Sequence, residues 1–179
     1  MKALLIVDVQ NDFCSGGALA TKGGEEVAPV INKIAHKFDL VVASKDWHPE
    51  QTVHFDKWPP HCVQGTHGAE FHADLNTDII DQVVEKGTAN MDDGYSAFEA
   101  TNLDLTQYLK SKGINTVYVC GIATDYCVLS SALDAQKQGF NTFFIKDAIR
   151  AVNLQDGDAD RAIAEMEQAG CIGIFSAEI

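Results

Sequence analysis

Apolar runs alternate with amphipathic stretches along most of the chain. Continuous apolar runs such as 3–7 and 116–121 are typical of strands that are covered on both faces of a sheet. The full pattern predicts strands at 3–7, 40–44, 81–86, 116–121, 141–148 and 171–175. It predicts helices at 26–37, 102–112, 124–138 and 158–169. Regular alternation of this kind predicts a Rossmann-like three-layer α/β/α fold, with a six-stranded, mostly parallel sheet between helices.

Residues 45–72 interrupt this alternation. They hold three prolines and no clear periodicity, which predicts a long ordered loop. Long ordered loops usually carry function. The chain has no internal repeat, low-complexity tract or linker, so we expect residues 1–179 to form a single domain.

Composition narrows the class of protein. Apolar residues make up 46% of the chain and its formal net charge is -13. The negative charge disfavours nucleic acid and anionic membranes as partners. It does not argue against a small-molecule substrate, which we expect as the partner. No apolar stretch approaches the roughly 18–20 residues of a membrane span, and the N-terminal run is interpreted as a strand. Five cysteines without clustered spacing favour reduced thiols and a cytoplasmic location.

A parallel sheet also raises a dinucleotide-binding hypothesis. The turn after the first predicted strand has the sequence VQNDFCSGG, which lacks the G-x-G-x-x-G fingerprint. No P-loop pattern occurs elsewhere. The sequence therefore gives this hypothesis little support.

Three chemically capable residues lie at or just beyond the ends of predicted strands. Asp8 follows the first strand, Lys86 ends the third and Cys127 lies after the fourth. Open parallel sheets place their chemistry at the carboxyl ends of their strands. We therefore expect a nucleophile, a proton-transfer carboxylate and a cation to meet in one crevice if the first strand neighbours the fourth.

Each of the three also has a structural alternative. Cys127 lies in the first turn of a predicted helix that Thr124 or Asp125 could cap, which would lower the pKa of its thiol; alternatively it is a small buried hydrophobe. Asp8 is either a buried carboxylate held in a structural pair or a residue that takes part in the reaction. Lys86 is either a solvated charge or keeps the Asp8 carboxylate ionised.

The loop after the second predicted strand predicts a metal site. Its segment DWHPEQTVHFDKWPPHC contains Asp46, His48, His54 and His61. A carboxylate with several imidazoles suits one divalent metal ion such as Zn, Fe or Mn. His67 and His72 follow closely and could compete as ligands.

Six segments in this order resemble one protein family. They are DVQNDFCSGGAL, KDWHPEQTVHF, WPPHCVQGTHGAEF, EKG, YSAFE and GIATDYCV. Together they are similar to the nicotinamidase (pyrazinamidase) branch of the isochorismatase-like hydrolases. The resemblance runs from Lys2 to about Ile149.

The resemblance implies roles for individual residues. Asp8, Lys86 and Cys127 match the catalytic triad of the family. The Ile122–Ala123 bond matches a non-proline cis peptide, which implies an oxyanion hole made by the N–H groups of Ala123 and Cys127.

The resemblance also implies a metal centre and a pocket. Asp46, His48 and His61 match the usual metal ligands, and His54 matches a further ligand found in part of the family. Phe13, Trp58 and Tyr95 match aromatic residues that line the substrate pocket. Tyr126 stands where some relatives carry His.

The implied reaction is hydrolysis of nicotinamide to nicotinate and ammonia through a Cys thioester, with pyrazinamide as a second substrate and NAD salvage as the context. Two other functions stay open from the sequence. One is another amidohydrolase of the same scaffold, of the carbamoylsarcosine or ureidoacrylate type. The other is a non-enzymatic metal- or redox-responsive protein with Cys127 as a sensor thiol. Both a monomer and a homo-oligomer fit the sequence.

Overall fold

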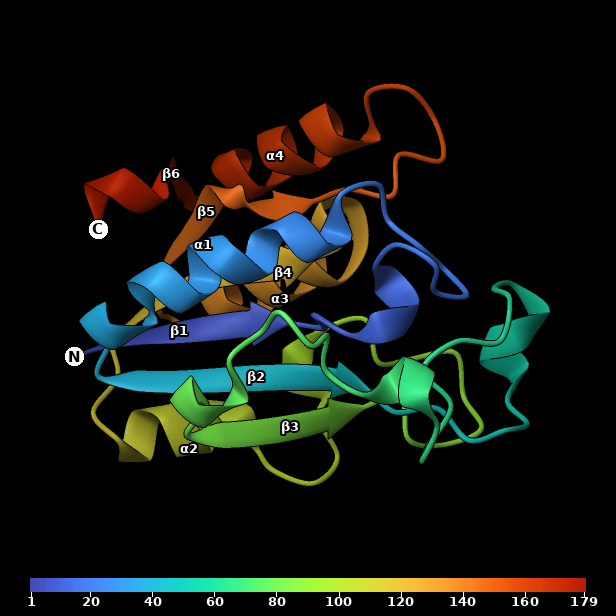
Figure 1. Ribbon diagram of the computed structural model, residues 1–179. Coiled ribbons are helices and arrows are strands. Elements are labelled where there is room, and N and C mark those ends of the chain that lie inside the picture. The colour runs from blue at the N-terminus through green and yellow to red at the C-terminus, as the bar shows by residue number, and fades with distance from the viewer.

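Six parallel strands form one sheet in the computed structural model, which describes residues 1–179 (Figure 1). The strands are β1 (Lys2–Val7), β2 (Leu40–Asp46), β3 (Gln82–Lys86), β4 (Thr116–Ile122), β5 (Asn141–Arg150) and β6 (Ile172–Ile174). Their order in the sheet is β3-β2-β1-β4-β5-β6, and every neighbouring pair is parallel. The predicted fold class is therefore confirmed.

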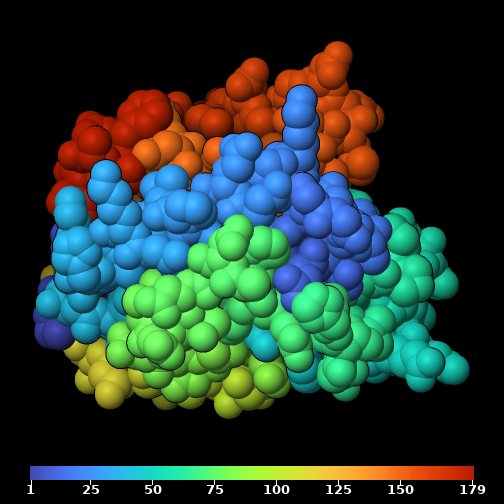
Figure 2. Space-filling view, in the orientation of Figure 1, coloured from blue at the N-terminus to red at the C-terminus, as the bar shows by residue number.

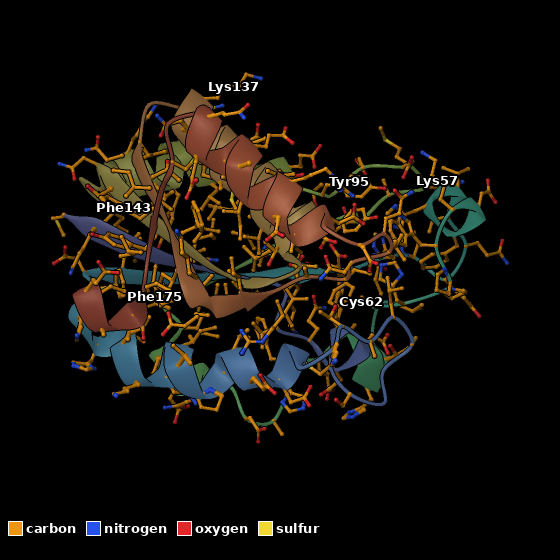
Figure 3. All side chains as sticks on the ribbon, turned by 90° about the horizontal axis from the view of Figure 1, so that it is seen from above. Lys57, Cys62, Tyr95, Lys137, Phe143 and Phe175 are labelled. Atoms are coloured by element: carbon orange, nitrogen blue, oxygen red, sulfur yellow. The ribbon has the colours of Figure 1, made fainter.

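Helices cover both faces of this sheet. They are α1 (Val27–Ile34), α2 (Leu105–Ser111), α3 (Leu129–Lys137) and α4 (Asp158–Gln168). Successive side chains of a strand point to opposite faces, so Leu4 and Ile6 of β1 pack in the core beneath α1. Leu5 and Val7 pack in the second core, beneath the other three helices. Figure 3 shows the sheet between these two layers.

Several predicted element boundaries differ from the structure. The helix predicted over 26–37 is α-helical only over Val27–Ile34 and is flanked by 3-10 turns. The helix predicted from 102 begins at Leu105, because the Asp104 side chain accepts a hydrogen bond from the Gln107 N–H at 2.9 Å and fixes the start. The strand predicted over 171–175 is shorter, and β5 extends to Arg150.

The start of the helix after β4 also departs from the prediction. Residues Thr124–Val128 form a π-helical turn, and α3 follows from Leu129. Neither Thr124 nor Asp125 caps this turn through its side chain. The Asp125 carboxylate instead accepts hydrogen bonds from the N–H groups of Val152 and Asn153 at 2.9 and 2.8 Å, so it ties this turn to the segment after β5.

The chain reverses its direction of travel across the sheet between β1 and β4. The carboxyl ends of these two strands therefore flank the topological switch point. The segment after β1 and the loop between β2 and β3 pack together there, with Asn11 N–H bonded to Glu70 O at 3.0 Å (Figure 2). None of the helices combines the length and apolar character that crossing a membrane requires.

Candidate active site

Asp8, Lys86 and Cys127 meet at the carboxyl edge of the sheet. The Lys86 Nζ lies 2.8 Å from Asp8 Oδ2 and 3.5 Å from Cys127 Sγ. Asp8 and Lys86 are fully buried, and Cys127 is 8% exposed. A carboxylate oxygen of Asp8 lies within 4.8 Å of the Cys127 sulfur. The structure thus brings together the three residues that the sequence predicted as a unit.

Sheet register accounts for this meeting. Val7 pairs with Ser44 of β2, so Asp8 emerges one residue beyond the ladder, with a backbone φ of 48°. Ser44 Oγ donates a hydrogen bond to Asp8 Oδ1 at 2.7 Å and orients the carboxylate. On the next strand pair, Asp46 is in register with Lys86. Three neighbouring strands therefore deliver two carboxylates and one ammonium to a single point.

Burial and charge shift the ionisation of these groups. Burial raises the pKa of Asp8, and the Lys86 ammonium opposes this shift without cancelling it. Burial also raises the pKa of the Cys127 thiol well above its usual range, against the effect of Lys86. Burial favours the neutral form of Lys86, but Asp46 and Asp8 outweigh this and hold its pKa well above the usual range. The direction of the Cys127 shift is thus opposite to the lowering of the pKa that a helix N-terminus was expected to cause.

Asp46 connects this triad to a cluster of imidazoles. Its Oδ1 forms an ion pair with Lys86, while its Oδ2 lies 3.5 Å from His48 Nε2 and 3.7 Å from His61 Nε2. His54 completes the cluster, since ring nitrogens of the three histidines lie within 4.8 Å of one another. Burial favours protonation of Asp46, yet the Lys86 ammonium holds its pKa well below the usual range.

Each imidazole of this cluster is oriented by an oxygen behind it. The Nδ1 atoms of His48, His54 and His61 contact Gly87 O at 3.0 Å, Asp92 Oδ1 at 3.1 Å and Pro59 O at 2.8 Å. These oxygens can only accept, so each ring carries its proton on Nδ1 and presents the lone pair of Nε2 to the cluster.

This arrangement fits a divalent metal ion. The Nε2 of His48 is buried and has no hydrogen-bond partner. Burial, followed by the nearby His48 and His61, lowers the pKa of His54, which favours the neutral imidazole that binds metal. Three imidazoles and one carboxylate, with outer oxygens already in place, form a donor set suited to Zn, Fe or Mn.

A glycine is required beside this cluster. Gly87 has a φ of +64°, and a Cβ atom there would lie 2.4 Å from the Cε1 atom of His48. Any larger residue would therefore displace the His48 ring.

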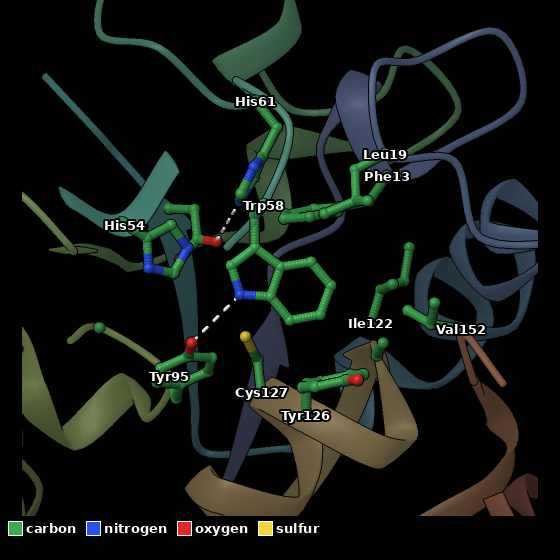
Figure 4. Close-up of a pocket in the computed structure, with 13 residues that line it drawn as sticks. Phe13, Leu19, His54, Trp58, His61, Tyr95, Ile122, Tyr126, Cys127 and Val152 are labelled. Atoms are coloured by element: carbon green, nitrogen blue, oxygen red, sulfur yellow. Dashed lines mark hydrogen bonds and ion pairs between the residues drawn. The ribbon is translucent and has the colours of Figure 1, made fainter. Parts of the chain in front are cut away.

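A small, mostly apolar pocket opens over Cys127 (Figure 4). Phe13, Trp58 and Tyr95 line it, with His54 and His61 on one side. The indole N–H of Trp58 donates to Tyr95 Oη at 3.2 Å, and Trp58 meets Tyr126 edge to face at a centroid distance of 5.0 Å. The walls suit a flat aromatic ring whose substituent reaches the sulfur.

The backbone at the mouth of the turn has the predicted unusual geometry. The Ile122–Ala123 peptide bond is cis, and both residues line the pocket beside Cys127. The cis bond is the one that the family resemblance implied, and the oxyanion hole stays a prediction.

Other candidate residues lie apart from this site. The His67 side chain is 85% exposed and faces Glu70, His72 faces Asp74, and neither joins the imidazole cluster. The remaining cysteines are buried, unpaired and absent from the pocket wall. Burial raises the pKa of Cys14 to about 12 and that of Cys171 to about 11.

Sequence reasoning missed several residues that shape the site. The buried Gln10 side chain accepts from Asp46 N–H at 2.9 Å and donates to Asp46 O at 2.8 Å, which fixes the backbone of that residue. Leu19 and Val152 complete the pocket wall, and Asp92 supports His54. Gln10 lies beyond the end of β1 at Val7, so strand alternation does not predict where its side chain points. Asp92 carries no sequence signal either.

Comparison with known proteins gives consistent matches. A model of the isochorismatase domain matches residues 2–178. A nicotinamidase of Acinetobacter baylyi is 40% identical, covering 99% of this chain and 94% of its own. The structure of PnC1 from L. infantum in complex with nicotinate superposes with a TM-score of 0.93 at 40% identity, covering 99% of this chain and 93% of that one. The structure of the pyrazinamidase of Pyrococcus horikoshii in complex with zinc superposes with a TM-score of 0.87 at 41% identity, covering 97% of this chain and 98% of that one.

Proposed function

The chain belongs to the isochorismatase family, and from its similarity to nicotinamidases we infer that it is a nicotinamidase, which hydrolyses nicotinamide to nicotinate and ammonia. One observation carries the chemical argument. The Cys127 sulfur, the Asp8 carboxylate and the Lys86 ammonium share one buried point at the base of an aromatic pocket. A carboxamide held on a flat ring can reach the sulfur through this pocket, which Cys127 lines.

We propose that Cys127 is the nucleophile and Asp8 the general base. Asp8 takes the thiol proton as the sulfur bonds to the carboxamide carbon. This transfer takes a negative charge from the Asp8 oxygen towards the sulfur without adding one, and formation of the carbon–sulfur bond passes the charge to the carboxamide oxygen. The Asp8 oxygen and the sulfur both lie close to Lys86 Nζ. The ammonium therefore stabilises the charge at either position, which explains how a thiol with a raised pKa can react.

The tetrahedral intermediate then collapses. In our proposal the N–H groups of Ala123 and Cys127 stabilise its oxyanion. The carbon–nitrogen bond breaks, the Asp8 proton passes to the departing nitrogen and ammonia leaves, so that a thioester remains on Cys127. Asp8 next takes a proton from a water molecule that attacks the thioester. The carbon–sulfur bond breaks, nicotinate forms, and the proton returns to the sulfur.

We propose that Asp46, His48, His54 and His61 hold one divalent metal ion. The unpartnered Nε2 of His48 and the oriented rings support this set. Zinc is our first choice, because a relative of 41% identity binds it. When bound, the ion supplies Lewis-acid coordination for a ring nitrogen or a water molecule beside the pocket.

Phe13, Trp58 and Tyr95 act in this proposal as the walls that hold the pyridine ring. Apolar walls discriminate weakly between rings of similar shape, so pyrazinamide is a second substrate. A pyrazinamidase among the similar structures supports this extension.

We also propose that residues 1–179 form one domain around the single sheet.

Five free cysteines support a cytoplasmic location. The nicotinate product supports a role in the salvage of nicotinamide released from NAD.

Ammonia release from a panel of substrates tests the proposed function. The panel contains nicotinamide, pyrazinamide, carbamoylsarcosine and isochorismate, and metal content is measured on the same sample. We expect ammonia from the first two amides at rates far above the third, and no turnover of isochorismate. Preference for carbamoylsarcosine, or no ammonia release by reduced and zinc-replete protein, would overturn the assignment.

A further inference from the structure

One carboxylate links the imidazole cluster to the aromatic wall of the pocket. Asp92 lies in the segment between β3 and Tyr95, and its side chain is 27% exposed. Its Oδ1 lies 3.1 Å from His54 Nδ1 and also 3.1 Å from Tyr95 Oη. Its Oδ2 forms an ion pair with Lys57. Neither Asp92 nor Lys57 lines the pocket.

The first contact controls the chemistry of His54. The Asp92 carboxylate can only accept a hydrogen bond, so the proton of the His54 ring lies on Nδ1. The ring therefore presents Nε2 to His48 and His61. The His54 ring also stacks on His48 at a centroid distance of 4.4 Å. His54 belongs to a 3-10 turn, Val53–Asp56, and not to a strand, so its ring depends on side-chain contacts for its direction.

The second contact controls the pocket wall. The Tyr95 hydroxyl donates its one proton to Asp92, which leaves its oxygen free to accept from the Trp58 indole N–H at 3.2 Å. The hydrogen bonds therefore run in one direction, from Trp58 through Tyr95 to Asp92. The same oxygen of Asp92 also accepts a hydrogen bond from the Nδ1–H of His54.

We propose that Asp92 is a positioning residue that holds His54 for metal binding and, through Tyr95, holds Trp58 in place for substrate binding. It touches neither metal nor substrate. Its effect on substrate rests on the proposed function, whereas its effect on metal does not.

The test compares variants of the full chain by two independent measurements. Zn²⁺ affinity is measured by competition with a chromophoric chelator, without substrate. The KM and kcat for nicotinamide are measured at saturating Zn²⁺. The variants are Asp92→Ala, Asp92→Asn, Tyr95→Phe, the double variant of Asp92→Ala with Tyr95→Phe, and Asp56→Ala. Asp56 is an exposed carboxylate on the same turn as His54, so its removal controls for the loss of one negative charge.

We expect Asp92→Ala to weaken Zn²⁺ binding by about 10–100-fold, the usual effect of losing an outer partner of a metal-bound histidine. Asp92→Asn keeps an acceptor oxygen and should bind Zn²⁺ with an affinity between those of Asp92→Ala and the wild type. Asp56→Ala should match the wild type within twofold. The thermal midpoint of the metal-free Asp92→Ala protein should fall by no more than about 4 °C, because the lost contacts are partly exposed.

The substrate arm separates the two roles. Tyr95→Phe removes only the phenol contact, so it should raise KM by about threefold to tenfold with Zn²⁺ affinity unchanged. Asp92→Ala should raise KM similarly, and the double variant should show no further increase, because both changes break the same chain of bonds.

Zn²⁺ affinity of Asp92→Ala within twofold of Asp56→Ala would overturn the metal role. Additive effects on KM in the double variant would overturn the link through Tyr95. A wild-type protein that binds Zn²⁺ but releases no ammonia from nicotinamide would refute the proposed function and leave the Zn²⁺ comparison to decide the role of Asp92.

Discussion

The ammonium nitrogen of Lys86 lies 3.5 Å from the sulfur of Cys127, in a part of the protein that water barely reaches. This one contact connects Cys127 to both carboxylates, because Lys86 also pairs with Asp8 and Asp46. The cation balances charge that the buried site could not otherwise hold. It also means that the thiol and the carboxylate compete for one proton beside a fixed positive charge.

The first prediction concerns the Cys127 thiol. Because burial raises its pKa, thiolate should form in the metal-free protein only above pH 9.0, the usual value for a cysteine. The measurement is the ultraviolet absorbance of thiolate as pH rises, taken as the difference between the wild type and Cys127→Ala. In Asp8→Asn the transition should move to lower pH, because the Asp8 charge contributes to the raised pKa. A transition near neutral pH in the wild type would contradict our account and favour activation by the helix terminus.

The second prediction concerns Asp8. Asp8→Asn keeps the shape of the side chain and its contact with Ser44 but removes the proton acceptor, so kcat for nicotinamide should fall by at least about 10²-fold. Asp39→Asn alters an exposed carboxylate at the opposite, amino end of β2 and should leave kcat unchanged. Zn²⁺ affinity measured on both variants would show that the metal site survives. A kcat for Asp8→Asn within tenfold of the wild type would exclude Asp8 as the base.

The third prediction concerns the metal. Dialysis against a chelator should abolish most turnover, and added Zn²⁺ should restore it. His61→Ala removes one of the converging ring nitrogens and should weaken Zn²⁺ binding by at least about tenfold. His67→Ala removes an imidazole that is 85% exposed and outside the cluster, so its Zn²⁺ affinity should equal that of the wild type. Equal losses in both variants would rule out the assigned ligand set.

Much of this site could be predicted because β-sheet geometry converts sequence position into spatial position. Asp8 follows the first predicted strand and Lys86 ends the third, and parallel strands bring such ends to one edge. The alternation of apolar runs with amphipathic stretches likewise predicted a parallel sheet covered by helices. The loop that we propose to bind the metal was recognisable because its histidines are dense in a segment that has no other periodic pattern.

Other features depend on contacts between segments that sequence spacing does not encode. The direction of the Cys127 pKa shift is one example, because burial of the sulfur raises the pKa against the lowering expected from the helix terminus. Asp92 is another, since only the folded loops bring it to His54, 38 residues away. Aspartate is a good capping residue, yet the Asp125 carboxylate accepts hydrogen bonds from the N–H groups of Val152 and Asn153 instead of capping the turn.

The fourth prediction uses two glycines with similar backbones. Gly87 and Gly65 have φ values of +64° and +74°, but a Cβ atom at Gly87 would strike His48, whereas one at Gly65 would meet nothing within 4 Å. Gly65→Ala should therefore cost about 1–2 kcal/mol of unfolding free energy from backbone strain alone. Gly87→Ala should cost more and should also weaken Zn²⁺ binding. Urea unfolding and chelator competition measure the two effects, and equal behaviour of the variants would show that His48 has room to move.

The thioester on Cys127 is the central claim, and partitioning with hydroxylamine tests it most directly. Hydroxylamine attacks thioesters, so a mixture of wild-type protein, nicotinamide and hydroxylamine should yield nicotinohydroxamate at the expense of nicotinate. Ammonia release should not slow. Cys127→Ala should form neither product above background, whereas Cys171→Ala, which changes a buried cysteine outside the pocket, should partition like the wild type. Normal ammonia release with no hydroxamate, or hydroxamate formed equally by Cys127→Ala, would contradict the account.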